Sequence, residues 1–405
     1  MRLGIFQNAF TALGGAELLA ATQAAWLAEQ GVDVTVAAFA FDESAWRPIL
    51  GPLPLRRIPK RTPLDPFIFW SKVLKLRARG RAVGRALSDF DAVLAHSHPS
   101  SALLGHAEVP GRKLWYCHEA PWRLHPEAPD YLLMKGLEAF RSRCDPGFFE
   151  ILSAFRDGIR ATSRRSAGLR RYDLAGAARV DTVMANSAFC RDALSRIYGR
   201  ADILLVPPIV RFAMAGPRAG LDGRNPGVLV MARLELLKNV ETVIRGFARL
   251  GRQRGARLHV VGEGRQRPRL ERVAAELGIA DSVTFHGYLD PVRDAEAFDR
   301  ICAACDVFAL LPLDESFGLV YPEAASRGLL LIGPEQGGPA EILDHGRLGR
   351  VAPALDAEAF AGALEATLSL SDEAAARQRE AADRACRARF SIEAAGPLLK
   401  NVLCG

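Results

Sequence analysis

Short apolar runs alternate with stretches of helical periodicity along nearly the whole chain. Such runs, when they are bounded by turn residues, are typical of strands buried on both faces, as in a parallel sheet covered by helices. In the first half of the sequence the runs are residues 3–7, 32–38, 92–95, 114–118, 182–185 and 203–206. In the second half they are residues 228–232, 257–261, 283–286, 307–311, 329–332 and 349–352. The alternation predicts an α/β protein with two doubly wound parallel sheets joined by right-handed crossovers.

A stretch rich in proline and glycine separates the two halves. It begins at Pro207 and Pro208 and closes at residues 225–227 (NPG), and this composition is typical of a linker. We therefore predict an N-terminal domain over residues 1–208, a linker over 209–226 and a C-terminal domain over 227–388. Ligands of such sheets bind beyond the carboxyl ends of the strands, so two units facing each other would share a central cleft.

Length and composition agree with this organisation. The chain has 405 residues, of which 49% are hydrophobic and 24% charged, which favours a globular protein of two domains over a disordered or fibrous one. Residues 1–6 lack the long apolar core of a signal peptide, and no apolar run has the length of a membrane span. We therefore expect a cytoplasmic protein.

Seven cysteines are present, and an odd number in such a chain favours reduced thiols over a disulfide framework. Cys302 and Cys305 have the spacing of a redox or zinc motif, but no second pair follows them. We interpret both as small buried hydrophobic residues and predict no metal site.

The net charge of +7 favours an anionic partner, such as a nucleotide diphosphate, a lipid phosphate, an anionic membrane or a nucleic acid. Basic residues concentrate within residues 56–85, where Phe67, Phe69 and Trp70 lie among them. The basic residues are Arg56, Arg57, Lys60, Arg61, Lys72, Lys75, Arg77, Arg79, Arg81 and Arg85. Two interpretations are open, namely peripheral contact with an anionic membrane and a solvated helix face above core aromatics.

Two loops carry residues suited to a phosphate. Gly14 and Gly15 follow the first predicted strand and precede a helix, where the backbone can approach an anion; a plain tight turn is the alternative. Arg233 ends a strand of the second half and Lys238 follows it closely, so both cations can reach one pyrophosphate. A solvated basic helix face is the alternative for this pair.

A third loop contains Gly262 and Gly264 directly after a predicted strand. Arg267 occupies the position of the third glycine in a dinucleotide fingerprint, so we reject nicotinamide binding. We predict instead that Gly262 brings the backbone close to a bound ligand.

The segment 310–328 is the most specific one in the sequence. Glu315 and Glu323 lie eight positions apart on either side of a predicted helix start at residues 316–319. Backbone donors at a helix start attract phosphate, and carboxylates accept hydrogen bonds from pairs of hydroxyl groups. The segment predicts a site for an elongated ligand that is both polyhydroxylated and phosphorylated.

These motifs occur in the order found in family 4 of the glycosyltransferases, and the chain resembles that family over nearly its whole length. The resemblance rests on the glutamate spacing, the loop 337–341 (GGPAE), Arg233 with Lys238, Gly14 with Gly15, His118, and Asn186 with Ser187. It implies the GT-B fold, with two Rossmann-like domains that face a central cleft and a C-terminal helix over 389–405 that packs back toward the N-terminal domain. The implied activity is hexose transfer from a nucleotide-diphosphate sugar with retention of configuration.

The resemblance also implies roles for single residues. Glu323 would hold the ribose hydroxyls, and Arg233 with Lys238 the diphosphate. Glu315 would hold the sugar hydroxyls and phosphate together with a backbone segment, while His118 would touch the transferred sugar. The implied catalytic residues are His118, Arg233, Lys238 and Glu315, and the implied donor-binding residues are Gly14, Gly15, Arg233, Lys238, Gly262, Phe317, Gly318, Leu319 and Glu323. Without the resemblance, core packing would be the preferred interpretation of His118.

The implied donor is a UDP- or GDP-sugar, and we expect no cofactor and no nucleic acid. Residues 115–119 (WYCHE) resemble mannosyltransferase members of the family. The expected acceptor is a glycan or lipid-linked glycan of the cell envelope, bound near residues 121–171, and the protein could lie peripherally on the inner face of the cytoplasmic membrane. Asp89 and Asp91 superficially match the metal-binding acidic pair of a different glycosyltransferase fold, but GT-B enzymes neutralise the leaving diphosphate with basic side chains and helix dipoles.

Three positions depart from the family pattern. Ala232 and Ser316 stand where glycine is common, and Asn239 stands where glycine often follows the lysine. Two alternatives therefore stay open, a sugar epimerase or phosphorylase on the same scaffold and a non-catalytic protein that binds nucleotide-sugar or glycolipid. The joint presence of the two glutamates, the arginine and the lysine favours a transferase.

Overall fold

The computed structural model describes residues 1–11, 14–60, 72–126, 137–213, 220–221, 225–290 and 293–405. The aromatic residues of the basic stretch, at 67, 69 and 70, lie outside these ranges. The chain divides into two compact units, described separately below. Unit 1 comprises Met1–Pro129, Asp157–Val210 and Phe390–Gly405, and unit 2 comprises Asp130–Arg156 and Arg211–Arg389.

Unit 1 contains a seven-stranded parallel sheet in the order β3-β2-β1-β4-β5-β6-β7. Its strands are β1 (Arg2–Phe6), β2 (Asp33–Ala38), β3 (Leu55–Arg57), β4 (Ala92–His96), β5 (Arg112–Cys117), β6 (Thr182–Ala185) and β7 (Leu204–Leu205). Ile5 and Phe6 are neighbours in β1 and belong to different buried clusters, because successive side chains point to opposite faces of a sheet. Both faces of the central strands are therefore buried.

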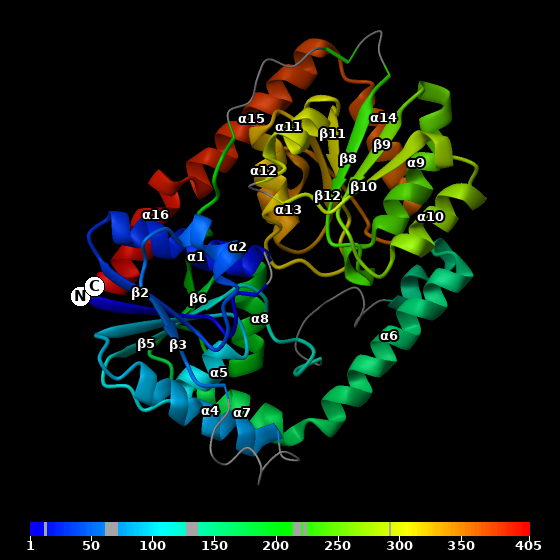
Figure 1. Ribbon diagram of the computed structural model, residues 1–405. Coiled ribbons are helices and arrows are strands. Elements are labelled where there is room, and N and C mark those ends of the chain that lie inside the picture. The colour runs from blue at the N-terminus through cyan, green and yellow to red at the C-terminus, as the bar shows by residue number, and fades with distance from the viewer. Residues whose placement is uncertain (12–13, 61–71, 127–136, 214–219, 222–224, 291–292) are drawn as a thin grey trace. The chain divides into compact units, whose positions relative to one another are not determined.

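Helices cover the two faces of this sheet (Figure 1). On one side α1 (Gly15–Glu29) contacts α2 (Glu43–Leu50) and α16 (Ile392–Cys404). On the other, α4 (Lys72–Ala86), α5 (Ser100–Gly105) and α7 (Ala167–Ala177) contact one another. The helix α8 (Ala188–Tyr198) follows β6 and packs beside it.

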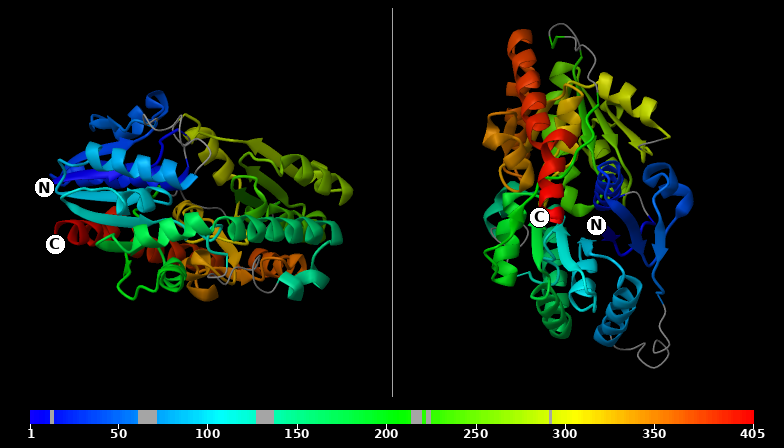
Figure 2. Two further views of the ribbon diagram at one scale, coloured as in Figure 1. Left: turned by 90° about the horizontal axis from the view of Figure 1, so that it is seen from below. Right: turned by 90° about the vertical axis from the view of Figure 1, so that its left-hand side faces the viewer.

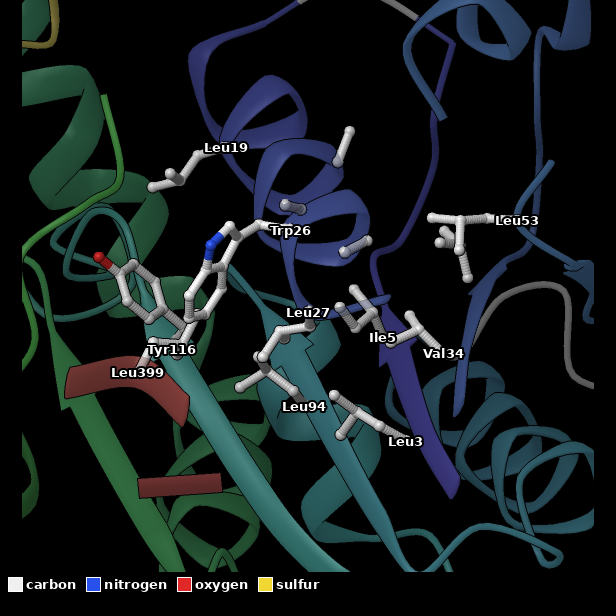
Figure 3. Packing of buried hydrophobic residues seen from close by; sticks show 14 of the residues in the cluster. Leu3, Ile5, Leu19, Trp26, Leu27, Val34, Leu53, Leu94, Tyr116 and Leu399 are labelled. Atoms are coloured by element: carbon white, nitrogen blue, oxygen red, sulfur yellow. The ribbon is translucent and has the colours of Figure 1, made fainter. Parts of the chain in front are cut away.

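Residues remote in sequence complete the core of unit 1. Leu399 of α16 is fully buried in the cluster that also contains Trp26 of α1 and Tyr116 of β5 (Figure 3). At Gly396 a Cβ would come within 2.5 Å of the Trp26 ring, so only glycine allows this approach. Both chain ends accordingly lie in unit 1 (Figure 2).

Unit 2 contains a six-stranded parallel sheet in the order β10-β9-β8-β11-β12-β13. Its strands are β8 (Gly227–Met231), β9 (Arg257–Val261), β10 (Val283–Gly287), β11 (Val307–Ala309), β12 (Leu330–Pro334) and β13 (Arg350–Ala352). Its helices include α9 (Val240–Arg254), α10 (Arg267–Glu276), α11 (Ala295–Ala303), α12 (Val320–Ser326), α13 (Gly338–Ile342), α14 (Ala357–Leu368) and α15 (Asp372–Phe390). The doubly wound prediction is confirmed for both units.

The predicted strands are all present, with small differences at their ends. The strand β3 was not predicted, because Arg56 and Arg57 make it basic and it lies at the sheet edge, where strands need not be apolar on both faces. None of the helices in the described part of the chain has the length and apolar composition needed to cross a membrane.

One segment of unit 2 comes from the middle of the sequence. The short helix η1 (Leu137–Arg143) precedes α6 (Pro146–Arg165), which begins in unit 2 and ends in unit 1. Asp145 accepts a hydrogen bond from the N–H of Phe148 at 3.0 Å and lies 3.8 Å from Arg245 of α9. The ring of Phe148 also lies beneath the guanidinium of Arg269. Ionic and cation–π contacts between residues remote in sequence thus hold this segment on unit 2.

Candidate functional site

The donor-binding residues predicted in unit 2 lie on loops that follow four of its strands. Arg233 and Lys238 follow β8, Gly262 follows β9, the segment around Glu315 follows β11, and the glycine loop at 337–338 follows β12. The carboxyl ends of parallel strands meet at one edge of a sheet. The topology therefore brings these loops to a common edge.

Lys238 and Glu315 form an ion pair at this edge. Lys238 Nζ donates a hydrogen bond to Glu315 Oε2 at 2.6 Å, and the two side chains are 22% and 21% exposed. An ion pair with this much access to solvent contributes little net stability, so each partner can exchange the other for a ligand. The sequence analysis predicts that the two residues bind different parts of a ligand, whereas in the structure they contact each other.

Arg233 lies exposed on a loop that is itself well anchored. Leu234 is fully buried beside it, and its N–H donates to the carbonyl of Glu263 at 2.8 Å. Within the described ranges, no carboxylate pairs with the Arg233 guanidinium. A free guanidinium on a fixed loop is well suited to bind an anion.

Asn239 accounts for one departure from the family pattern. Its φ of +52° is left-handed, a conformation that glycine adopts readily and asparagine tolerates better than most other residues. Its buried amide nitrogen donates to the carbonyls of Leu311 at 2.7 Å and Ala354 at 2.5 Å. Asparagine thus supplies both the turn conformation and a link between loops.

The glycines after β9 are explained by contact with the loop after β8. A Cβ at Gly262 would come within 1.8 Å of the Ala232 carbonyl, and one at Gly264 within 2.4 Å of the Leu234 carbonyl. The N–H of Gly262 donates to the carbonyl of Gly287 at 2.8 Å. A direct contact between Gly262 and a ligand stays a prediction.

The loop after β12 supports the loop after β11. The N–H of Gly338 donates to the Glu315 carbonyl at 3.0 Å, and a Cβ at Gly338 would come within 2.2 Å of the carbonyl of the buried Ser316. Gly318 has a φ of +93°, and a Cβ there would come within 2.8 Å of the Tyr321 ring. The backbone path around Glu315 is therefore tightly fixed.

Phe317, Gly318 and Leu319 lead directly into α12, as the sequence predicts. Phe317 is 5% exposed, and Leu319 is the N-cap residue of the helix. Glu323 lies in the first turn, and its backbone N–H donates to the Leu319 carbonyl at 3.2 Å.

Glu323 is partly buried, and burial raises the pKa of its carboxyl to about 7, against a smaller lowering by Arg327. Across the ranges that the structure covers, no group donates a hydrogen bond to this carboxylate. Its capacity to accept hydrogen bonds is thus available for a ligand such as a diol.

In unit 1, the predicted residues also follow strands at the carboxyl edge of the sheet. Gly14 is the N-cap residue of α1, with Gly15 as the first helical residue. His118 follows β5, and its Nε2 lies 2.9 Å from Nδ1 of His96 at the end of β4. Asn186 follows β6 and donates to the His118 carbonyl at 2.8 Å.

Burial lowers the pKa of His118 to about 3. The imidazole is consequently neutral near pH 7 and can exchange hydrogen bonds with a sugar without carrying charge.

The acidic pair near β4 is bound by arginine. Arg56 hydrogen-bonds to Asp89 and holds the pKa of that carboxyl at about 2, and the backbone N–H of Arg2 donates to Asp91 at 2.7 Å. Within the described part of the chain, no group of His, Cys, Asp and Glu side chains is arranged to hold a metal ion.

The interpretation of Cys302 and Cys305 as buried hydrophobic residues is confirmed. They are 2% and 0% exposed, and neither forms a disulfide.

Two family models match the chain. Residues 13–212 match the model described as "Glycosyltransferase Family 4", and residues 217–385 match "Glycosyl transferases group 1". The chain belongs to the group 1 glycosyltransferases of family 4. The chain is also similar to curated glycosyltransferases, with about a third of the residues identical over the matched regions.

The D-inositol 3-phosphate glycosyltransferase of Nocardia farcinica is 32% identical over 213 residues, which are 48% of this chain and 46% of the relative. The lipopolysaccharide core biosynthesis glycosyltransferase LpsE of Rhizobium meliloti is 32% identical over 154 residues, which are 38% of this chain and 43% of the relative. The match thus spans about half the length of these curated relatives.

Solved structures of glycosyltransferases share the fold over the whole chain. HepE of Anabaena, in complex with UDP-glucose, matches with a TM-score of 0.73 and 18% identity over 99% of both chains. WaaG, a glycosyltransferase involved in lipopolysaccharide biosynthesis, matches with a TM-score of 0.63 and 15% identity over 100% of both chains. The chain has the GT-B fold.

Proposed function

We propose that this protein transfers a hexosyl group from a UDP- or GDP-sugar to a hydroxyl group of a glycan or lipid-linked glycan, with retention of configuration. The observation that carries the proposal is the edge of the unit 2 sheet. It presents the exchangeable pair Lys238–Glu315, together with Arg233 and Glu323, whose side chains have no hydrogen-bonding partner among the described residues. Family membership and the UDP-glucose complex of HepE support a nucleotide-sugar donor.

Each group has a task that its chemistry suits. The planar guanidinium of Arg233 and the point charge of Lys238 would bind the diphosphate. Glu323 would accept hydrogen bonds from the ribose hydroxyls, and Glu315 from the hexose hydroxyls. Donor binding would then replace the Lys238–Glu315 contact with two contacts to the ligand.

We propose that the reaction is a front-face substitution, as the resemblance to the family implies. The bond between the anomeric carbon and the diphosphate oxygen breaks, and its electron pair stays on the diphosphate. The acceptor oxygen bonds to the same face of the sugar and passes its proton to a diphosphate oxygen. Arg233 and Lys238 stabilise the charge that develops on the leaving group, while neutral His118 hydrogen-bonds to the transferred sugar.

The hexose and the acceptor belong to the same proposal. The sequence run at residues 115–119 favours mannose, and the UDP-glucose complex of HepE favours a UDP donor. The name of the Rhizobium meliloti relative, LpsE, supports an acceptor in envelope polysaccharide or glycolipid synthesis. We also propose peripheral contact with an anionic membrane through the basic residues of α4.

The test is a panel of UDP- and GDP-sugars in a thermal-shift assay, followed by measurement of nucleotide release with hexoside acceptors in the presence of a chelator. A ligand that binds only the folded protein raises the melting temperature. We expect one nucleotide to give a selective rise, turnover that persists without divalent metal, and a product with the anomeric configuration of the donor by NMR. Absence of stabilisation by every donor would refute the proposal, and loss of turnover that magnesium restores would refute its metal-independent chemistry.

A further inference from the structure

A buried hydrogen-bond network in unit 1 is not used by the chemistry described above. Its centre is Asp173 of α7, which is 1% exposed. Its Oδ2 accepts hydrogen bonds from His125 Nε2 at 2.9 Å and from the Tyr198 hydroxyl at 2.7 Å. Its Oδ1 lies 3.4 Å from Nε2 of His98.

His98 differs from the other histidine of the network in its access to solvent. The His98 side chain is 31% exposed, whereas that of His125 is 5% exposed. His98 therefore joins a buried carboxylate to the surface of unit 1.

The position of His98 coincides with the edge where ligands of such sheets bind. It follows β4 by two residues, and His96 at the end of β4 contacts His118. Ser97 between them has a left-handed φ of +60°, a conformation that is uncommon for serine. The N–H of Ser97 donates to the Tyr116 carbonyl at 3.2 Å, which holds the loop in this path.

The carboxylate of Asp173 favours one tautomer of the His98 imidazole. Burial raises the pKa of Asp173, but hydrogen bonds from His125, His98 and Tyr198 outweigh this effect and hold the pKa below its ordinary value. The Asp173 carboxylate oxygen 3.4 Å from His98 Nε2 favours the tautomer that carries its proton on Nε2, which leaves a lone pair on Nδ1. Nδ1 can accept a hydrogen bond from a hydroxyl group, whereas a phosphate or carboxylate oxygen has no proton to donate to it.

We propose that His98 binds a hydroxyl group of the glycosyl acceptor through Nδ1, and that Asp173 is the positioning residue that sets its tautomer and orientation. The inference deepens the proposed function and rests on it. Unit 2 then supplies the groups for the phosphorylated donor, and unit 1 supplies an acceptor of hydrogen bonds for a sugar hydroxyl group.

The first test compares His98→Gln with a matched control, His106→Gln. His106 is a half-buried histidine that hydrogen-bonds to the backbone of α7, at the Tyr172 carbonyl, but lies at the far end of α5 from the β4 loop. The probes are the methyl glycosides of glucose, galactose and mannose, with the donor selected by the panel above. Loss of one hydrogen bond predicts a roughly three- to tenfold increase in the acceptor KM.

The split between the two substrates separates this role from a structural one. In His98→Gln the donor KM and the donor-induced thermal shift should keep their wild-type values, and in His106→Gln neither KM should change. An unchanged acceptor KM in His98→Gln, or an equal rise in the donor KM, would overturn the proposal.

A second test does not depend on turnover. In protein with ¹⁵N-labelled histidine, studied at alkaline pH, the His98 ring should show a protonated Nε2 and an unprotonated Nδ1. We expect the Nδ1 resonance to shift on addition of a methyl hexoside, and Asp173→Asn to abolish the tautomer preference. An Nδ1 resonance that no hexoside moves would contradict the assignment.

Failure of the proposed function would look different from failure of this inference. A wild-type protein that no nucleotide-sugar stabilises would refute the transferase proposal as a whole. A wild-type protein that transfers sugar with a His98 resonance insensitive to the hexoside would refute only the role of His98.

Discussion

The proposed donor-binding side chains differ in the contacts and charge that they have before a ligand binds. Arg233 has no ion-pair partner among the described residues, Lys238 must leave Glu315, and Glu323 must hold its charge in a partly buried position. The two cations and the carboxylate therefore predict different consequences when they are replaced.

Arg233→Ala and Lys238→Ala should each lower kcat by about a hundredfold, because each removes a cation that stabilises charge on the leaving diphosphate. Arg272→Ala is the matched control, since Arg272 is an exposed arginine of α10 remote from the strand ends. The measurement is kcat of each variant, by steady-state kinetics at saturating donor, compared with wild type and the control. Turnover near the wild-type value in both variants would contradict the proposed mechanism.

Glu323 predicts a pH dependence of donor affinity. With a pKa of about 7, the carboxyl group loses its proton as the pH rises from 6 to 8, and only the carboxylate accepts hydrogen bonds fully from the ribose hydroxyls. The Kd for the nucleotide-sugar should fall by about tenfold over this interval, and Glu323→Gln should abolish the change. Calorimetric titration with UDP-glucose avoids the terminal phosphate of UDP, which itself titrates near pH 6.

The same raised pKa has a consequence for stability with the opposite sign. Between the ordinary pKa of 4.5 and the raised value of about 7, the folded state binds the proton more tightly than the unfolded state does. The contribution of Glu323 to the free energy of unfolding therefore falls as the pH rises through this window. Binding and stability should thus respond to pH in opposite directions.

Single residues were predictable only as far as local sequence determines them. The types and spacing of Glu315, Glu323, Arg233 and Lys238 indicated a phosphorylated and hydroxylated ligand. The Lys238–Glu315 ion pair joins residues 77 positions apart, and no local pattern reports such contacts. Nor did any motif connect the residues around Asp173, whose network depends on tertiary packing.

The loop after β12 fixes the loop that carries Glu315, and a single methyl group can test this contact. Gly338→Ala would place a Cβ within 2.2 Å of the Ser316 carbonyl and displace the backbone that leads into α12. We expect donor affinity to fall by at least tenfold, because a displaced carboxylate no longer meets its hydroxyl groups. Gly362→Ala in α14 is the control, since nothing lies within 4 Å of a Cβ there.

The control variant, Gly362→Ala, should slightly raise the free energy of unfolding of the protein. Alanine is favoured over glycine in a helix interior by roughly 0.5–1 kcal/mol. If Gly338→Ala binds the donor as tightly as Gly362→Ala, the loop after β12 does not determine the geometry of the site.

The helix α4 presents Arg77, Arg81 and Arg85 as exposed residues at intervals of four, which places them on one face. Replacing all three with glutamine should weaken binding to anionic lipid vesicles at low salt by about a hundredfold, at about 1 kcal/mol for each charge. Cosedimentation with anionic and neutral vesicles measures the effect. Equal binding of wild type to both kinds of vesicle, or no binding at all, would remove the membrane proposal.

Strands were predictable where both faces are buried, because such strands read as continuous apolar runs. The edge strand β3 was not predicted, because it contains two arginines and lacks a continuous apolar run. The helix α6 was not predicted either. Contacts between residues remote in sequence, such as Asp145 with Arg245, position its first turns, and the local sequence pattern does not indicate such contacts.

Unit 1 depends on α16 for its core, and neighbouring leucines of that helix provide a matched comparison. Leu399 is fully buried, whereas Leu398 is 48% exposed. Leu399→Ala should lower the free energy of unfolding of unit 1 by about 2–5 kcal/mol, and Leu398→Ala by less than about 0.5 kcal/mol.

Intrinsic fluorescence can follow this unfolding selectively, because all five tryptophans precede residue 130 and belong to unit 1. Donor-induced stabilisation of unit 2 should persist in both variants. Equal fluorescence transitions for Leu398→Ala and Leu399→Ala would show that α16 does not complete the unit 1 core.

The contribution of α16 also sets an order of events during synthesis on the ribosome. Domains generally fold as their chain emerges, the N-terminal one first. Here the apolar surface around Trp26 is covered by α16, which is translated only after residues 211–389. The whole sequence of unit 2 is therefore synthesised before that of unit 1. The nascent protein therefore carries an unfinished apolar surface through much of its translation, and that surface is where a chaperone would bind it.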